Sequence, residues 1–335
     1  MRNKPLTIGV VGAGRVGATL ATALAAAGHR VVVAAGRSAA SRRRIAHQLP
    51  ALTVVPADRV AARAELLLLS VPDDALAGLV AAMAGSGADL AGRDLGSARG
   101  ADGGYRAVRR GQIVAHTSGA YGLGVLAPVV AAGARPLALH PAMTFTGTDV
   151  DVDRLAAGVS FGVTAPDDLR PLATRLVADL GGTVEWVPEQ RRELYHAALA
   201  HGANHLVTLV NEAADRLRDA GVADPARVLD PLLRAALENA LHLGDAALTG
   251  PVSRGDAGTV ARHLAVLAAT APESVPPYLA LARRTADRAI AAGLLPATDV
   301  GPLLDVMAGT RAGGQTMTGT AAERPRTGTA AEATP

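Results

Sequence analysis

Short runs of aliphatic and β-branched residues alternate with alanine-rich stretches of helical periodicity through the first half of the chain. The first run is Thr7–Val11, and an alanine-rich segment ending at Ala27 separates it from a second run at residues 29–34. Gly28 stands where a helix C-cap glycine belongs. Strands that alternate with helices are typical of a parallel, doubly wound sheet. The predicted fold class is therefore α/β, with a doubly wound N-terminal domain.

Six later runs continue this pattern, so we expect a sheet of roughly eight strands. They lie at residues 52–55, 66–71, 112–116, 134–139, 159–164 and 183–186. Residues 85–111 interrupt the pattern, because they are rich in glycine, arginine and aspartate and have little apolar periodicity. We expect this segment to be a mobile, exposed insertion in a first domain that spans residues 1–187.

From residue 188 the pattern becomes helical. Helices are expected at residues 189–220, 225–243, 256–269 and 276–292, and no run there is typical of a strand. These segments predict a second, all-α domain over residues 188–307. Residues 308–335 are mostly glycine, threonine, alanine, glutamate and proline, so we expect a disordered tail.

The composition narrows the functional classes. None of the 335 residues is a cysteine, which excludes disulfides and thiolate chemistry. The formal net charge is only +3 and aromatic residues make up 2%, so nucleic-acid binding is not expected. The longest apolar runs are too short to span a bilayer, and the first residues lack the apolar core of a signal peptide. We therefore predict a cytoplasmic protein without a membrane partner.

A glycine motif follows the first strand at residues 12–17, Gly-Ala-Gly-Arg-Val-Gly. Gly12 permits a tight turn, Gly14 lets the backbone approach a pyrophosphate, and Gly17 allows close packing of helix and strand. Arg15 and Val16 open the helix, whose free N–H groups favour phosphate. The strand, turn and helix together predict a dinucleotide-binding Rossmann domain. The alternative is a glycine-rich turn in an α/β domain that binds no ligand.

The end of the second strand distinguishes the two nicotinamide cofactors. NAD enzymes usually carry an acid there, whereas this chain has Arg37 and Ser38, followed by three arginines at residues 42–44. A guanidinium group binds phosphate in bidentate fashion. The sequence therefore predicts NADP rather than NAD, although a solvated basic helix start would look the same.

Other candidate groups lie where later parallel strands end, since cofactors bind at that edge of such sheets. Val71 and Pro72 are expected to contact the ribose or nicotinamide. The hydroxyl of Ser118 could bind the carboxamide or the substrate. His140 is a candidate acid or carboxylate ligand.

Taken together, several short motifs resemble those of a known family. They are residues 12–17, 70–74, 116–119, 139–141 and 195–198, Asn204, and residues 248–256. The chain resembles a bacterial family that pairs a Rossmann-like domain with a helical domain of unknown function. That family is similar to ketopantoate reductase, pyrroline-5-carboxylate reductase, 6-phosphogluconate dehydrogenase and β-hydroxyacid dehydrogenases. The resemblance extends from Leu6 to about Ala292, and it implies reduction of a small keto acid or imine in a dimer built on the helical domain.

The chain departs from those relatives at one position. Several of them use a lysine and an asparagine one helical turn apart; Asn204 matches the asparagine, but Ala200 stands where the lysine would be. Lys4 is the only lysine in the chain. His196 lies one further turn back on the same helix face, so it is a candidate proton donor. The alternative is a structural histidine near the domain junction.

The helical domain offers two further groups. Arg254 could bind a substrate carboxylate, or it could pair with Asp256, which is expected to cap the next helix. His201 and His205 have the spacing of metal ligands on a helix, but no third ligand is evident, so no metal site is predicted.

These features predict an NADP-dependent oxidoreductase that reduces a small carboxylate-bearing ketone, such as a ketopantoate-like 2-keto acid, or an imine. A deazaflavin could take the place of that substrate. The alternative from a different class is a non-catalytic NADP(H)-binding sensor or scaffold protein, which the missing lysine favours. The expected partners are a small-molecule substrate and a second copy of the chain, which would form a homodimer through the helical domain.

Overall fold

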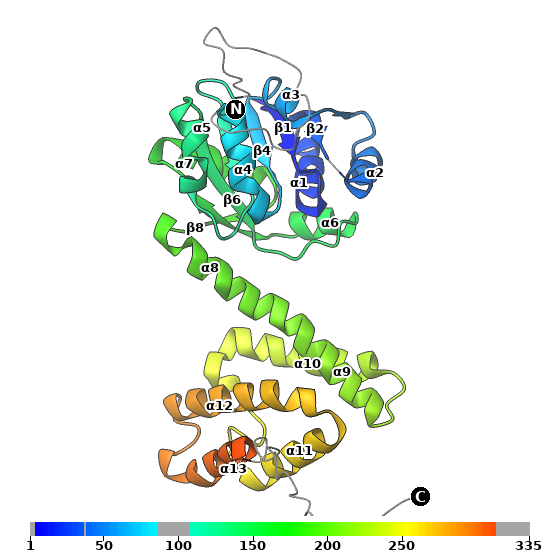
Figure 1. Cartoon of the computed structure of the whole chain (residues 1–335), viewed down its shortest axis with the longest axis vertical. Coiled ribbons are helices and arrows are strands. Elements are labelled where there is room, and N and C mark those ends of the chain that lie inside the picture. The colour runs from blue at the N-terminus through cyan, green and yellow to red at the C-terminus, as the bar shows by residue number, and fades with distance from the viewer. Residues whose placement is uncertain (1–3, 37, 86–107, 313–335) are drawn as a thin grey trace, which may run out of the picture. The chain divides into compact units, whose positions relative to one another are not determined.

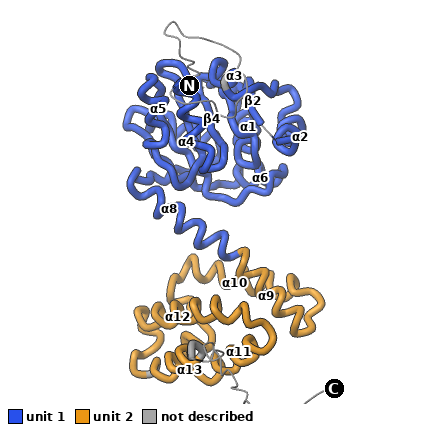
Figure 2. Tube along the Cα trace, viewed as in Figure 1, with its two compact units in different colours: residues 1–206 blue, residues 207–335 orange. Residues whose placement is uncertain are grey.

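The computed structural model describes residues 4–36, 38–85 and 108–312. The chain forms two compact units, residues 1–206 and 207–335 (Figure 2). Most of the predicted insertion at 85–111 and the end of the predicted tail lie outside the described residues, as does Arg37. In the described ranges, no helix has the length and apolar character needed to cross a bilayer.

The N-terminal unit contains one eight-stranded sheet (Figure 1). Its strands lie in the order β3-β2-β1-β4-β5-β6-β7-β8. Their bounds are β1 (Thr7–Val11), β2 (Arg30–Ala35), β3 (Thr53–Val54), β4 (Leu66–Leu69), β5 (Ile113–His116), β6 (Arg135–Pro141), β7 (Ser160–Thr164) and β8 (Thr183–Trp186). All eight strands lie at the predicted places, within a few residues. The strand order reverses between β1 and β4, which is where dinucleotides bind in such folds.

Helices cover both faces of this sheet. Their bounds are α1 (Arg15–Ala26), α2 (Ala39–Gln48), α3 (Ala57–Ala61), α4 (Asp73–Met83), α5 (Ala127–Ala131), α6 (Val150–Ala156) and α7 (Arg170–Asp179). One core cluster joins the strands to α1, α2, α6 and α7, and the other joins them to α3, α4 and α5. The apolar run of β4 serves both, because Leu66 and Leu68 enter the first core while Leu67 and Leu69 enter the second. The predicted doubly wound α/β fold is confirmed.

One feature of the predicted sheet is wrong. β6 and β7 pair antiparallel, and β8 pairs parallel with β7, so the last two strands run against the other six. The connection at residues 142–159 starts at the end of β6 and returns at the same edge of the sheet. A strand that begins beside the end of its neighbour must run in the opposite direction. The hydrophobic pattern of a buried strand is the same in either direction.

After β8, the short helix η3 (Glu189–Arg191) leads into α8 (Arg192–Leu199), the π-helical turn η4 (Ala200–Asn204) and α9 (His205–Asp219). The remaining helices are α10 (Pro225–Leu243), α11 (Ala257–Thr270), α12 (Val275–Ala291) and α13 (Gly301–Ala312). The predicted helical character of the C-terminal part is confirmed. The pattern did not predict α13, which extends into the segment expected to be a disordered tail.

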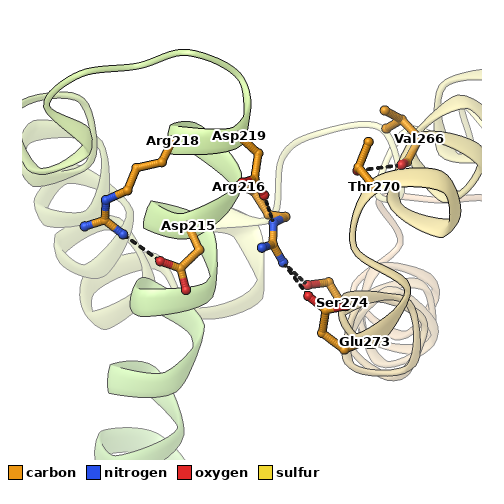
Figure 3. Close-up of polar contacts among 8 residues, drawn as sticks. All are labelled: Asp215, Arg216, Arg218, Asp219, Val266, Thr270, Glu273 and Ser274. Atoms are coloured by element: carbon orange, nitrogen blue, oxygen red, sulfur yellow. Dashed lines mark hydrogen bonds and ion pairs between the residues drawn. The ribbon is translucent and has the colours of Figure 1, made fainter.

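The C-terminal unit has its own apolar core, formed by α11, α12 and α13 together with residues 248–252 and 295. Arg216 connects the end of α9 to the turn before α12 (Figure 3). Its guanidinium group donates to Glu273 at 3.1 Å and to Ser274 at 2.8 Å, and it pairs with Asp219 at 2.8 Å. These bonds fix the C-terminal end of α9 within the unit.

Candidate active site

The turn after β1 has the backbone that a dinucleotide phosphate requires. Gly12 has φ +92°, and a Cβ there would lie 2.4 Å from the carbonyl oxygen of Ser70. A Cβ on Gly17 would lie 2.3 Å from the Gly12 carbonyl oxygen, so α1 packs directly on the turn. The nearest atom to a Cβ on Gly14 would be 4.0 Å away, so that side is open. No side chain caps α1 and its first turn has no acid, so the helix N-terminus fits an anion.

Basic side chains border the loop between β6 and α6, next to this turn. Arg44 donates from Nε to the carbonyl oxygen of Gly147 at 3.2 Å. A Cβ on Gly147 would lie 2.9 Å from both Arg15 Cγ and Arg44 Nε, so the two arginines meet at this glycine. Ser38 is exposed and caps the N-terminus of α2. The end of β2 carries no acid, so the described residues fit a cofactor with an additional phosphate.

The carboxyl ends of β4 and β5 lie side by side, as their parallel pairing requires. The hydroxyl groups of Ser70 and Thr117 are 2.9 Å apart and hydrogen-bonded. Val71 is half-buried and Pro72 is exposed at the start of α4. Ser118 is buried, and its hydroxyl oxygen accepts the Tyr121 N–H at 3.1 Å. The predicted cofactor contacts thus share one edge, although the Ser118 oxygen already has a partner within the chain.

Two histidines from distant parts of the sequence meet at Gly119. A Cβ on this residue would lie 2.5 Å from His196 Cδ2 and 3.0 Å from His140 Nε2. The two imidazole rings are 5.9 Å apart in an edge-to-face arrangement. His140 comes from β6 and His196 from α8, and both are half-buried. Gly119 follows Thr117 by two residues, Thr117 is hydrogen-bonded to Ser70, and Ser70 lies against Gly12. Short contacts therefore connect the two histidines with the glycine turn.

Tyr195 joins this pair. Its hydroxyl group lies 2.9 Å from His140 Nδ1. Burial, together with a smaller effect from the nearby charge of Arg192, lowers the pKa of His140 to about 4. Burial raises the pKa of the Tyr195 phenol. His140 is therefore a neutral imidazole and Tyr195 a neutral phenol at physiological pH.

A third histidine, His116, has a structural role at the end of β5. It is buried, with Nε2 2.8 Å from the carbonyl oxygen of Gly122. Its Nδ1 accepts the Ser118 N–H at 3.2 Å. Burial lowers its pKa to about 4, so the neutral ring donates from Nε2 and accepts at Nδ1. This ring shapes the segment that carries Gly119.

Arg192 is the main residue of the site that the sequence analysis missed. Its side chain is almost fully buried, and burial lowers its pKa. It donates to the carbonyl oxygens of Ser118 at 2.5 Å, Tyr121 at 3.0 Å and Gly162 at 3.0 Å. None of these acceptors is a carboxylate. The guanidinium group also lies 5.6 Å from the ring of Tyr195, so it joins β7, the segment after β5, and α8.

Asn204 lies in η4, where the His205 N–H bonds to the Ala200 carbonyl oxygen in a π turn. The Asn204 side chain is exposed. The prediction that Asn204 and His196 share one helix face assumed regular α-helical spacing, and the wider π turn changes that spacing. His201 and His205 approach each other, with 3.0 Å between their Nδ1 atoms. The described residues contain no group of three potential metal ligands.

Arg254 belongs to the C-terminal unit, in the loop before α11, and its side chain is exposed. Asp256 caps α11 by accepting the Thr259 N–H at 2.9 Å, as predicted. The charge of Arg254 contributes to lowering the pKa of Asp256, after larger effects from the hydrogen bonds to Thr259. The proposed role of Arg254 in substrate binding stays a prediction.

The architecture defines a class of protein that joins a Rossmann-like domain to a helical domain. A model of the Rossmann-like domain matches residues 1–105 and 103–141, and the Domain of unknown function (DUF2520) matches residues 159–285. The chain therefore carries both of these domains, one after the other, which confirms the resemblance. No curated protein matches the sequence.

Solved structures with this fold include several oxidoreductases. A provisionally assigned NADP oxidoreductase from Bacteroides fragilis is 21% identical, with a TM-score of 0.67 over 84% of this chain and 98% of that one. A 1-pyrroline-5-carboxylate reductase from Streptococcus pyogenes is 16% identical, with a TM-score of 0.53 over 85% and 98%. A reductive aminase from Aspergillus terreus, in complex with NADPH4, cyclohexanone and allyl amine, is 17% identical, with a TM-score of 0.52 over 92% and 95%. At these identities the likeness establishes the fold.

Proposed function

We propose that the chain is an NADP-dependent oxidoreductase that reduces a small carboxylate-bearing ketone, such as a ketopantoate-like 2-keto acid, or an imine. The observation that carries this proposal is the meeting of His140 and His196 at Gly119, beside the carboxyl edge of a sheet with a dinucleotide turn. The similar solved structures named as NADP oxidoreductase, pyrroline-5-carboxylate reductase and reductive aminase support the same class of reaction. When bound, the nicotinamide would supply a hydride to the carbonyl or imine carbon.

The two histidines have different roles in this proposal. His140 is neutral, with a pKa of about 4, so it can donate a hydrogen bond but holds no transferable imidazolium proton near neutral pH. His196 lies beside it on α8, so it is the other histidine of the pair that donates the proton to the substrate oxygen or nitrogen. Asn204 and Arg254 are proposed to bind the polar groups and the carboxylate of the substrate.

The experiment is NADPH oxidation by the purified protein over a panel of 2-keto acids, β-hydroxyacid precursors and cyclic and acyclic imines. Turnover of one class above the rate without substrate supports the oxidoreductase. NADPH binding by calorimetry without turnover of any panel member would support the sensor or scaffold alternative. Ala200, at the position of the relatives' lysine, is the observation that favours that alternative.

The choice of NADP rests on the basic residues beside the glycine turn. Arg15 and Arg44 meet at Gly147, and Ser38 opens α2. A 2′-phosphate would accept charge-assisted hydrogen bonds there, each contributing roughly 1.5–3 kcal/mol. Titration of NADPH and NADH into the same protein tests this choice. Equal affinity for the two cofactors would contradict it.

We also propose that the chain is a homodimer through the helical unit. In α10, Leu232 and Leu241 are 62% and 76% exposed, although they are nine residues apart and so project from opposite sides of the helix. Exposed leucines on two sides of one helix are the kind of apolar surface that an interface covers, so a second copy that packs on α10 accounts for this exposure. Light scattering after gel filtration should show a dimer, and Leu232→Glu with Leu241→Glu should give a monomer. Val130→Glu in the N-terminal unit is the control, and a monomeric wild type would contradict the proposal.

A further inference from the structure

The hydrogen bond between Tyr195 and His140 uses the ring nitrogen that does not face Gly119. His140 Nδ1 lies 2.9 Å from the Tyr195 hydroxyl, whereas Nε2 would lie 3.0 Å from a Cβ on Gly119. No described residue is hydrogen-bonded to this Nε2. One nitrogen of His140 is therefore occupied within the chain, and the other is available beside His196.

The absence of a side chain at Gly162 makes room for the ring of Tyr195. In the sheet, Gly162 of β7 lies directly opposite His140 of β6. A Cβ on Gly162 would lie 2.5 Å from both Cζ and the hydroxyl oxygen of Tyr195. Only a residue without a side chain lets the phenol lie against the strand at this point. The position of the hydroxyl is thus set by the sheet and by α8 together.

The direction of the hydrogen bond follows from the chemistry of the two groups. Burial raises the pKa of Tyr195, so the phenol keeps its proton. A phenol O–H is a more acidic donor than a neutral imidazole N–H, and an unprotonated imidazole nitrogen is a more basic acceptor than a phenol oxygen. The phenol proton is then directed to His140 Nδ1. A neutral imidazole that accepts at Nδ1 carries its single proton on Nε2.

We infer that Tyr195 is a positioning residue that holds His140 as the Nε2–H tautomer, and that this N–H donates a hydrogen bond to the reacting oxygen or nitrogen of the substrate beside His196. The part that concerns the substrate rests on the proposed function. No proton leaves His140 in this role. Its neutral N–H polarises the substrate, and His196 supplies the proton.

The charged and titratable groups around His140 support a fixed neutral form. Arg192, His196 and His116 all face it, and a positive charge on any of them disfavours a proton on His140. Burial has the largest effect on its pKa. The tautomer should therefore persist over the whole range above pH 6, and it should not depend on whether His196 is protonated.

Two-bond nitrogen–proton NMR spectra of the ¹⁵N-labelled full chain, with NADP(H) and without substrate, report the tautomer directly. We expect His140 to show a protonated Nε2 and an unprotonated Nδ1. Tyr195→Phe removes only the hydroxyl, and it should turn this pattern into a mixture of tautomers. Gly162→Ala, which displaces the ring, should have the same effect. A wild-type spectrum with the proton on Nδ1 would overturn the inference.

The C-terminal unit offers a matched control. His263 Nδ1 lies 2.9 Å from the Tyr278 hydroxyl, and the two rings are also edge to face. Tyr278→Phe should change the signals of His263 and leave those of His140 and the turnover unchanged. If Tyr278→Phe altered His140 in the same way as Tyr195→Phe, the effect would be a general loss of stability, and the inference would fail.

Kinetics with a substrate from the panel then test the link to function. Tyr195→Phe should lower kcat by about tenfold, the scale of one neutral hydrogen bond, with unchanged affinity for NADPH. A normal kcat together with a mixed tautomer would refute the role of the His140 N–H. Absence of turnover in the wild type with the expected tautomer would instead refute the proposed function and leave the structural role of Tyr195 standing.

Discussion

Replacing Arg192 by methionine tests whether one buried cation holds the candidate site together. Arg192 is 1% exposed and donates three hydrogen bonds of 3.0 Å or less to backbone carbonyl oxygens. Methionine fills a similar volume but donates nothing, so the buried carbonyl oxygens of Ser118 and Gly162 and the part-buried one of Tyr121 lose this partner. We expect the N-terminal unit to lose stability and the histidines to lose their relative position.

The magnitude is the difference between two opposing contributions. Each buried acceptor left without a partner costs about 1–3 kcal/mol, so the two buried ones cost about 2–6 kcal/mol and the part-buried one adds less. Against this, the variant no longer buries a guanidinium group without a carboxylate partner, which costs several kcal/mol in the wild type. A net loss of about 3 kcal/mol in the free energy of unfolding is therefore expected for Arg192→Met.

Urea unfolding followed by fluorescence is a suitable assay, because Trp186 is the only tryptophan and lies in β8 of the N-terminal unit. Arg192→Lys keeps the positive charge but not the planar set of N–H donors, so this variant should recover little of the lost free energy of unfolding. Arg135→Met is the control, since its ion pair with Asp168 is exposed and should contribute less than about 1 kcal/mol. A loss below about 1 kcal/mol for Arg192→Met would refute the reasoning.

Three further predictions concern the proton donor, the buried histidines and the cofactor. His196→Ala should lower turnover by roughly 10²–10⁴ with unchanged NADPH affinity, and an equal fall in both would indicate misfolding instead. His116 and His140 have pKa values of about 4 in the folded chain and about 6.5 when unfolded, so stability should be full above pH 6.5 and fall as the pH drops towards 4. The loss should approach about 3 kcal/mol for each histidine, and thermal melts at several pH values measure it. Arg37→Asp should weaken NADPH binding strongly and NADH binding little, as measured by calorimetry. Equal losses of affinity for the two cofactors would contradict the prediction that the end of the second strand selects NADP.

The sequence predicted the central strands well because each is a buried apolar run with clear ends, whereas the edge strands β3 and β8 are mostly exposed. The four consecutive leucines at residues 66–69 are typical of a strand that is covered on both faces. The glycine turn was equally predictable from the sequence. Gly17 is required by its contact with Gly12, and Gly12 by its contact with Ser70 at the end of the neighbouring strand β4. Strand direction was not predictable, because the apolar pattern of β7 and the short run of β8 would be the same whichever way the two strands ran.

The candidate site was only partly predictable. His140 and His196 were selected from motifs, but their meeting depends on a contact between residues 56 positions apart in the chain. Arg192 was not singled out, since nothing in the local pattern shows that three distant carbonyl groups surround it. The available signal was Gly162, because a glycine inside a strand often marks the close approach of another group.

Two opposite charges at the start of α8 place Tyr195 and His196 through contacts within the N-terminal unit. Glu189 accepts the N–H groups of Leu123 and Gly124 at 2.6 and 2.8 Å, and Arg192 donates to the carbonyl oxygens of Ser118 and Tyr121, which precede them in the same segment. Together they fix the first turn of α8 against the segment that follows β5. Tyr195 and His196 follow within the next turn, so their positions are set inside residues 1–206. A side chain fixed in this way keeps its place through contacts within residues 1–206 alone, so Glu189 and Arg192 are the residues on which the position of His196 depends.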